Sequence, residues 1–353
     1  MSGKFERILL LCAAKYSLYN SLISILELMS EDVKGYDVRN SLGAFSLKVQ
    51  SQSFRFPYKI RNVLERDLLV KANSELLNEI RAYKPDVVFV YNSEYLIPET
   101  CAEIKNTAKL IFFMGDSPFF TPLNPYYLSC LNYADLILCP DTFWINQLNM
   151  LGIRQTAYFL PGIDTSSYYT LDDATDDELI ESKDLIYSGS CYNNSWGYKK
   201  ALLMSRFTGM NFSLYGNKSW KRWFDFFPEL SSHFVESGYI PTERLNRMFN
   251  RAKIMPVDGN PAILHGFHLR LFEALGSGVL PLTEYRQDIE NIVFEESVVK
   301  PPLIRDYTDA RQLAEYYLSD EPERKKTIAA LRSFVLEKYN PRENARRLDK
   351  LVV

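Results

Sequence analysis

Paired cysteines, long apolar runs and a start typical of a signal peptide are all missing from this sequence. Its five cysteines are dispersed and form no CxxC pair, which argues against a disulfide framework and fits a reducing compartment. No charge-free apolar stretch approaches the roughly 20 residues of a membrane span. The apolar run before Lys15 is too short for a secretory signal and predicts a first buried strand. We therefore expect a cytoplasmic protein, with attachment to the inner face of the membrane as an open alternative.

Motifs for metals, nucleotides and common hydrolases are missing too. The chain has no DxD between apolar strands, no HExxH and no paired Cys/His set, so we expect no metal site and no cofactor. It has no GxSxG elbow, Walker loop or GxGxxG, which disfavours hydrolases, NTPases and dehydrogenases. The formal net charge of −3 gives no basic field for nucleic acid, and we expect no nucleic-acid partner.

What is present is a regular alternation of short apolar strands and amphipathic helices. Polar residues follow three of the strands directly: Asn92, Asp116 and Asp141. This pattern predicts a doubly wound α/β sheet, whose ligand crevice lies beyond the carboxyl ends of its strands. In the first half we expect strands over 7–12, 85–92, 108–116 and 134–141 and helices over 17–31 and 62–82.

The alternation of strands and helices is interrupted once and then resumes. Residues 159–183 contain Pro161-Gly162, a Ser/Thr cluster and an acidic run, as expected of an interdomain connection. In the second half we expect strands over 184–190, 211–216, 252–257 and 279–285 and helices over 197–207, 242–251 and 269–278. The predicted organisation is an N-terminal domain over 1–160, a linker over 161–183, a second domain over 184–335 and a terminal helix over 336–353 that returns to the first domain.

The stretch 265–285, HGFHLRLFEALGSGVLPLTEY, carries the most chemistry. Arg270 falls in the first turn of the predicted helix and Glu273 lies three residues on, on the same face. Free amides at a helix N-terminus together with an arginine can hold a diphosphate, and a carboxylate one turn further can accept from ribose hydroxyls. The alternative is an exposed helical ion pair, with Gly276 and Gly278 as simple caps.

The same stretch resembles the donor-site motif of GT-B glycosyltransferases, written R-x-x-E-A-x-x-x-G-x-x-P. Arg270, Glu273, Ala274, Gly278 and Pro281 fill its positions. The R-x-F-E core is similar to that of glycosyltransferases related to the spore maturation protein CgeB. The resemblance implies two Rossmann-like domains facing a central cleft, a nucleotide-sugar donor on the C-terminal half, no need for a bound metal and a role in polysaccharide biosynthesis.

Other segments of the C-terminal half also resemble GT-B donor domains, and this resemblance implies donor-binding roles for particular residues. The segment 184–195 looks like the first strand and Gly-Ser loop of a donor domain, and 237–241, SGYIP, looks like the turn that meets the nucleotide base. By that likeness the diphosphate is bound by Arg270, the ribose by Glu273, the phosphate side by Gly189 and Ser190, and the base by Tyr239 and Ile240.

One position departs from the pattern of many retaining GT-B enzymes. These carry E-x7-E, and here His265 stands where the first Glu would be. We expect His265 and His268 to contact the donor sugar or phosphates. The alternative, that both are partly exposed loop residues, stays open, and so does the stereochemical outcome.

The N-terminal half offers candidates for the catalytic base. Asp116, in FFMGDSPFF, follows a buried strand, and related sequences place an Asp-x-Pro there. A carboxylate with a raised pKa can deprotonate an acceptor hydroxyl, although a turn or N-cap role is an equal alternative. Glu94 is the second candidate, for catalysis or for binding acceptor hydroxyls. Asp141 is interpreted as a helix cap for 142–150.

The prediction is therefore a glycosyltransferase that moves a sugar from a nucleotide-sugar donor to a hydroxyl of a glycan, a lipid-linked or another small acceptor. The alternatives are a nucleotide-sugar epimerase or hydrolase on the same scaffold, or a non-catalytic binding module. Two basic, aromatic or amphipathic stretches, 220–227 and 322–353, are interpreted as packed helices. Weak peripheral membrane contact is their alternative.

Overall fold

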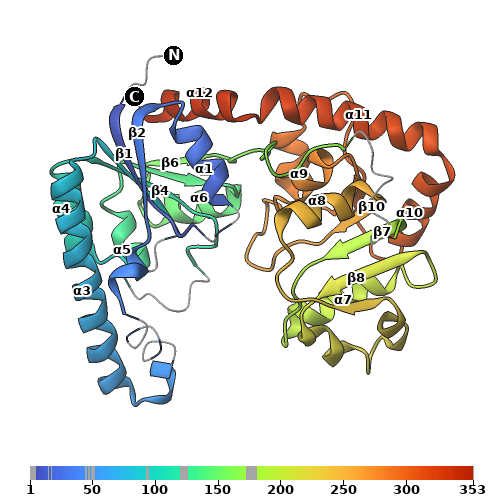
Figure 1. Ribbon diagram of the computed structural model, residues 1–353, viewed down its shortest axis with the longest axis horizontal. Coiled ribbons are helices and arrows are strands. Elements are labelled where there is room, and N and C mark those ends of the chain that lie inside the picture. Colours follow the sequence, from blue (N-terminus) through green and yellow to red (C-terminus); the bar gives the residue numbers. More distant parts are fainter. Residues whose placement is uncertain are drawn as a thin grey trace. The chain divides into compact units, whose positions relative to one another are not determined.

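The computed structural model describes residues 5–14, 16, 18–43, 46, 48, 52–92, 95–119, 126–171 and 181–352. The chain divides into two compact units, Met1–Pro161 with Pro341–Val353, and Gly162–Asn340. In its described part each unit holds one six-stranded parallel sheet with helices packed against it (Figure 1). The predicted α/β fold with two Rossmann-like, doubly wound domains is confirmed.

The sheet of the first unit has the order β2-β1-β3-β4-β5-β6. All its neighbouring strands are parallel. The order reverses between β1 and β3, so the topological switch point, where such sheets bind ligands, lies at the carboxyl ends of these two strands. The strands are β1 Phe5–Leu11, β2 Ser30–Tyr36, β3 Val87–Tyr91, β4 Lys109–Phe113, β5 Leu136–Cys139 and β6 Thr156–Tyr158.

Six helices of the described first unit surround this sheet. The last of them comes from the chain's end and contributes Ala345, Leu348 and Val352 to the core around Phe89. It packs on the first helix of the unit. These helices are α1 Leu18–Leu26, α3 Tyr58–Tyr83, α4 Pro98–Lys105, α5 Tyr127–Leu131, α6 Thr142–Met150 and α12 Pro341–Val352, with short 3-10 turns at Val38–Ser41 and Ser53–Arg55.

The expected helix over 17–31 is wrong at its end. Helix α1 stops at Leu26, and the edge strand β2 starts at Ser30. Strand β2, SEDVKGY, is charged and largely solvent-accessible, because only one side of an edge strand pairs with the sheet. It lacks the apolar run by which a buried strand is recognised. Helix α3 begins at Tyr58, before the expected 62, and ends at Tyr83; its C-cap residue Lys84 has a left-handed φ of 53°.

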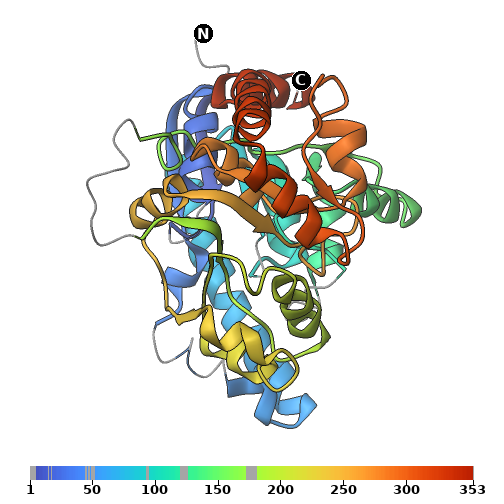
Figure 2. The same cartoon turned by 90° about the vertical axis from the view of Figure 1, so that its right-hand side faces the viewer.

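The sheet of the second unit has the order β12-β11-β10-β7-β8-β9, again with parallel neighbours. Its switch point lies between β7 and β10. Figure 2 gives a second view of this sheet, whose strands are coloured from yellow-green to orange. The strands are β7 Lys183–Ser188, β8 Phe212–Gly216, β9 Phe234–Glu236, β10 Ala252–Val257, β11 Leu280–Glu284 and β12 Leu303–Ile304.

The helices of the second unit include the element that the donor motif predicts. Helix α9 ends before Gly278, whose φ of +78° permits the tight turn into β11. In the stretch 220–227 Trp220 and Trp223 are buried, as the packing interpretation expects, but Phe226 is 63% exposed and the stretch contains a 3-10 turn rather than an α-helix. No helix within the described ranges has the length and apolarity to cross a membrane. The helices are α7 Ser195–Ser205, α8 Thr242–Asn250, α9 Arg270–Gly276, α10 Ala310–Ser319 and α11 Glu321–Lys338, with 3-10 turns at Lys218–Trp223 and Pro228–Ser232 and a π-helical turn at Ile289–Val293.

Asp141 caps α6, as the sequence indicates, and provides a test of the fold. Its buried carboxylate accepts from the Phe143 amide at 2.7 Å and the Trp144 amide at 3.3 Å. Replacing Asp141 by Ala should lower the free energy of unfolding by about 1–2 kcal/mol, measured by urea unfolding. Asp141→Asn keeps an acceptor oxygen and should lose less. An Ala variant as stable as the wild type would contradict the capping role.

Candidate functional site

The switch point of the second unit collects charged and glycine residues from separate elements. Gly189 follows β7, and Asp258 follows β10. Helix α7, which starts after the β7 loop, supplies Lys200, and α9 supplies Arg270. Because β7 and β10 are adjacent and parallel, their carboxyl ends bring these residues to one edge of the sheet, where ligands of open α/β sheets bind.

Gly189 and Arg270, both predicted donor-binding residues, are in direct contact. A Cβ built on Gly189 would lie 2.8 Å from Arg270 Nη1 and 2.8 Å from the Tyr187 hydroxyl. The guanidinium also lies over the Tyr187 ring, 5.7 Å from its centroid. Only glycine leaves room for this approach, so the glycine after β7 is required for the position of Arg270.

Asp258 ties Tyr187 and Lys200 together beside this contact. Tyr187 Oη donates to Asp258 Oδ1 at 2.7 Å, and Lys200 Nζ lies 3.2 Å from Asp258 Oδ2. Lys200 also donates to the Ser190 carbonyl at 2.9 Å. Burial opposes the ionisation of Asp258, but the charge of Lys200 and the Tyr187 hydrogen bond outweigh it, and the pKa of Asp258 is lowered. Two cations, Lys200 and Arg270, thus face one fixed anion.

Arg270 is incompletely paired with Glu273. Its Nε lies 3.9 Å from Glu273 Oε2, and both side chains are about four-fifths buried, 19% and 20% exposed. Nε is buried without a hydrogen-bond partner. Burial raises the pKa of Glu273, against the charge of Arg270. The pair is not the exposed helical ion pair of the alternative interpretation, and Arg270 retains hydrogen-bonding capacity for an anion.

His268 is held in one tautomer beside Arg270. Its Nδ1 accepts from the Arg270 amide at 3.1 Å, so the proton of the neutral ring lies on Nε2. Burial, followed by the positive charge of Arg270, lowers the pKa of His268 to about 3, although Asp258 opposes this. At neutral pH the ring is therefore an uncharged Nε2–H donor.

The expectation that free amides open α9 is wrong. The Arg270 amide is bonded to His268 Nδ1. The amides of the following residues donate to nearby carbonyls: Leu271 to His268, and Phe272 and Glu273 to Leu269. The loop before the helix thus satisfies the groups that a simple helix end leaves unpaired. Side chains, rather than the helix N-terminus, carry the positive potential here.

The remaining predicted donor residues are Tyr239, Ile240 and His265. Tyr239 is 86% exposed on the loop between β9 and α8, and Ile240 packs against the core of β10 and α8. The His265 carbonyl accepts from the Asp288 amide, next to the π-helical turn. Tyr168 on the same side lowers the pKa of Glu273, against the effect of burial. The structure thus brings Gly189, Ser190, His268, Arg270 and Glu273 together.

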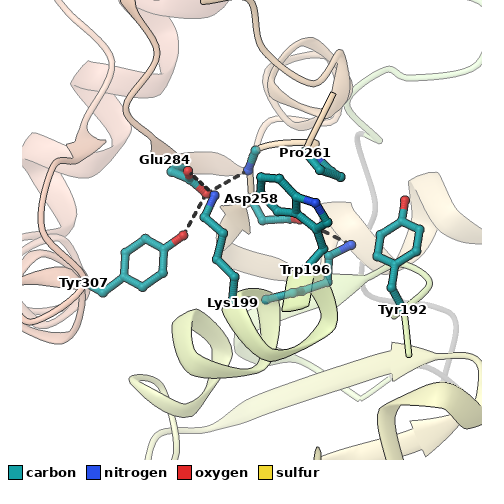
Figure 3. Close-up of a pocket in the computed structure, with 9 residues that line it drawn as sticks. Tyr192, Trp196, Lys199, Asp258, Pro261, Glu284 and Tyr307 are labelled. Atoms are coloured by element: carbon teal, nitrogen blue, oxygen red, sulfur yellow. Dashed lines mark hydrogen bonds and ion pairs between the residues drawn. The ribbon is translucent and has the colours of Figure 1, made fainter. Parts of the chain in front are cut away.

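Beside Asp258 is a small pocket whose polar wall is Glu284 (Figure 3). Glu284 Oε1 lies 2.5 Å from Lys199 Nζ and 2.9 Å from Arg286 Nη1. Its Oε2 accepts from the Gly259 amide and the Tyr307 hydroxyl. The opposite wall is apolar and consists of Tyr192, Trp196 and Pro261.

Sequence reasoning missed Lys199, Lys200, Asp258 and Glu284. Asp258 directly follows strand 252–257, and the rule applied to Asn92 and Asp116 would have found it. The two lysines lie inside α7, and only the path of that helix across the sheet edge brings them to Asp258 and Glu284.

The two tryptophans of the stretch 220–227 support the loop that carries Gly189. Trp220 Nε1 donates to the Gly189 carbonyl, and Trp223 Nε1 donates to the Tyr192 carbonyl, both at 2.9 Å. The rings are buried, so both bonds are shielded from water. The loop after β7 is thereby fixed at its two ends.

In the first unit Asp116 follows β4, and Asn92 follows β3. Asn92 Nδ2 donates to Asp116 Oδ2 at 2.7 Å. Although the residue reaches solvent, burial of its carboxylate raises the pKa of Asp116, as a catalytic base requires. Glu94, the second candidate, lies outside the described residues.

Comparisons with known proteins agree with this geometry. Residues 199–350 match a family model described as glycosyl transferase-like. UDP-forming α,α-trehalose-phosphate synthase from Burkholderia xenovorans has a similar structure, with a TM-score of 0.66, 12% identity and coverage of 100% of this chain and 99% of that chain. The chain has the GT-B fold, and its second half matches the glycosyl transferase-like family model.

Two further solved structures have this GT-B fold. HepE from Anabaena, in complex with UDP and glucose, has a TM-score of 0.64 and 11% identity, and the match covers 98% of each chain. Sucrose-phosphate synthase from Thermosynechococcus elongatus has a TM-score of 0.62 and 13% identity, with 81% of this chain and 77% of that chain covered. Among curated proteins none matches the sequence.

The tautomer and pKa of His268 in this GT-B protein lead to a stability prediction. The folded pKa, about 3, is below the ordinary value of about 6.5. The contribution of His268 is therefore full above pH 6.5 and is lost as the pH falls toward 3, because only the unfolded chain takes up the proton. His268→Asn should flatten the fall in unfolding free energy between pH 7 and 5 by up to about 1.4 kcal/mol per pH unit.

Chemical denaturation at a series of pH values measures this effect, with each variant referred to its own stability at pH 7. In the wild type, ¹⁵N chemical shifts of the His268 ring should show the Nε2–H tautomer throughout this range. Equal slopes in both proteins, or a ring that titrates near pH 6.5, would contradict a buried neutral histidine.

Proposed function

We propose that this chain is a glycosyltransferase that transfers a sugar from a nucleotide-sugar donor, bound by the second unit, to a hydroxyl of an acceptor. The observation that supports this most is the charge at the second switch point. Lys200 lies 3.2 Å from Asp258, Arg270 is only loosely paired with Glu273 at 3.9 Å, and Arg270 Nε is buried without a hydrogen-bond partner. A diphosphate at the carboxyl ends of β7 and β10 would supply the missing acceptors.

Arg270 and Lys200 would neutralise the diphosphate as the glycosidic bond breaks. Positive side chains preorganised in a partly buried site stabilise a leaving group more strongly than they would in water. Gly189 would let the phosphates approach the backbone, and Ser190 would contact their other side. We propose that these side chains carry the charge of the leaving group without a bound metal ion.

Uridine is the proposed nucleoside of the donor. Solved structures of this fold contain UDP or UDP-glucose, among them HepE from Anabaena. Glu273 would accept from the ribose hydroxyls, because its side chain is about four-fifths buried beside Arg270. The exposed Tyr239, with Ile240, would cover the base. The Nε2–H of His268 would donate to the diphosphate or to a sugar hydroxyl, and His265 would contact the sugar.

The first unit would bind the acceptor. Asp116 would remove the proton of the attacking hydroxyl, since its raised pKa matches a general base, and Glu94 remains the second candidate. The R-x-F-E core at Arg270 supports a relationship to the CgeB-like enzymes. With it we propose a glycan or lipid-linked acceptor, a role in polysaccharide biosynthesis and a cytoplasmic location, at the inner face of the membrane where the acceptor is a lipid.

Arg270→Ala should abolish most nucleotide binding. A ligand at a hundredfold excess over its Kd stabilises the folded chain by about 2.7 kcal/mol, so UDP should raise the melting temperature of the wild type. The variant should need at least about tenfold more UDP for the same shift, because a charge-assisted contact is lost. Thermal-shift titrations with UDP, GDP, dTDP and CMP measure this.

Arg311→Ala serves as the control for Arg270→Ala. Arg311 is an exposed arginine of the same unit, paired with Glu315 on α10, and its variant should respond to UDP like the wild type. If Arg270→Ala binds UDP as tightly as the control does, the diphosphate site has been assigned to the wrong residues.

Asp116→Asn should lower kcat by about 10²–10⁴-fold, the usual contribution of a general base. UDP binding should be unchanged, because the donor residues lie in the other unit. In the wild type kcat should fall on the acid side, with its midpoint above the ordinary Asp pKa of about 3.9, since burial raises that of Asp116. Release of UDP from the preferred donor reports the rate.

Asp67→Asn, at an exposed position of α3, is the control and should keep the wild-type rate. Wild-type turnover by Asp116→Asn would show that another group acts as the base.

A further inference from the structure

We propose that Asn92 is a positioning residue, whose side-chain amide holds the Asp116 carboxylate so that Oδ2 is anchored and Oδ1 faces the acceptor hydroxyl. This inference rests on the proposed role of Asp116 as the base. It concerns two residues at the ends of neighbouring strands, β3 and β4, beside the switch point of the first unit.

The backbone at Asn92 is bent into a conformation that few residues adopt. Its φ is 43°, in the left-handed region, where Asn is several-fold enriched among non-glycine residues. The Asn92 amide still donates to the Phe113 carbonyl at 3.3 Å, one position beyond the ladder between β3 and β4. The bend directs the side chain across to the segment that follows β4.

The side-chain amide of Asn92 can face Asp116 in only one way. Its Oδ1 accepts from the Gly115 amide at 2.7 Å and from the Asp116 amide at 3.1 Å. Two N–H groups require an oxygen opposite them, so Nδ2 must be the atom that donates to Asp116 Oδ2, at 2.7 Å. Three bonds thereby fix both the backbone and the carboxylate of Asp116.

Asp116 has no ion-pair partner among the described residues. Tyr91 faces it from β3, and that ring packs edge-on against Tyr16 at 5.9 Å. The other titratable groups on this side are Cys12, which follows β1, and Arg39, which lies over the Tyr16 ring. Arg39 is itself paired with Asp37 at 2.7 Å. The Asn92 hydrogen bond therefore orients a carboxylate that no described cation holds.

Gly115 lets Tyr91 close one side of this arrangement. A Cβ at Gly115 would lie 2.5 Å from the Tyr91 hydroxyl, so the ring rests directly on the backbone between β4 and Asp116. No described group donates to Asp116 Oδ1. With Oδ2 anchored, Oδ1 is the oxygen available to accept the proton of an acceptor hydroxyl.

Asn92→Asp tests this role with little change in shape. The aspartate keeps an oxygen for the Gly115 and Asp116 amides and tolerates the left-handed backbone, but it replaces the Nδ2 donor by a second carboxylate. Two neighbouring carboxylates cannot easily both ionise. We expect the proton shared with Asp116 to be lost at least about one pH unit higher than in the wild type, measured by ¹³C-carboxyl NMR with Asp116→Asn for assignment.

The kinetics should follow the titration. The acid limb of kcat should move to higher pH by the same amount, while KM for the donor stays unchanged. Asn92→Gly keeps the backbone conformation without the amide and should lower kcat about tenfold to a hundredfold. Asn106→Asp, the same substitution at an exposed position of the first unit, should leave both the limb and the rate unchanged. UDP-dependent stabilisation shows that each variant is folded.

The outcomes distinguish the role of Asp116 as the base from the role of Asn92 in positioning it. If Asp116→Asn is inactive but Asn92→Asp shows the wild-type titration and acid limb, the positioning role is overturned and the base assignment stands. If Asp116→Asn turns over like the wild type, the base assignment fails, and the role of Asn92 fails with it.

Discussion

The contact between the Arg270 guanidinium and the backbone of Gly189 is the constraint on which the proposed donor site depends. A side chain at Gly189 would collide with both Arg270 and Tyr187, so the glycine, the tyrosine and the arginine fit only together. Trp220 fixes the Gly189 carbonyl from the other side. Asp258 joins Tyr187 to Lys200. The position of this cation at the end of β7 therefore depends on five segments: β7 with its loop, α7, the turn Lys218–Trp223, the residue after β10, and α9.

The sequence predicts the parts of this site that follow from local rules. Arg270 and Glu273 share a helix face because they are three residues apart, and Gly189 is found because it ends an apolar strand. Asp258 was missed, although it directly follows an apolar strand, as Asn92 does. Lys200 could not be placed, since its position depends on the direction of α7. The bond from the Arg270 amide to His268 is also invisible in a motif, so the helix end was expected to be open.

In the fold, too, local sequence patterns predict some elements, whereas others depend on contacts with distant segments. Buried central strands such as β3 and β4 are predicted because they are apolar on both faces. The edge strands β2 and β12 were not predicted, because β2 is charged and β12 has only two residues. Such strands are stabilised by pairing with the neighbouring strand rather than by their own apolar pattern. The switch points follow from the strand order, which no local pattern contains.

Two aspartates that follow sheet strands have opposite environments: Asp258 follows β10, which borders its switch point, and Asp116 follows β4, one strand away from its own. Asp258 faces Lys200 and the Tyr187 hydroxyl, which lower its pKa despite burial. Asp116 has the neutral Asn92 as its partner, and burial raises its pKa. A permanently ionised carboxylate is suited to holding cations, whereas one with a raised pKa is suited to taking a proton. The partner supplied by the adjacent element, a lysine in one unit and an asparagine in the other, decides which carboxylate is structural and which can act as a base.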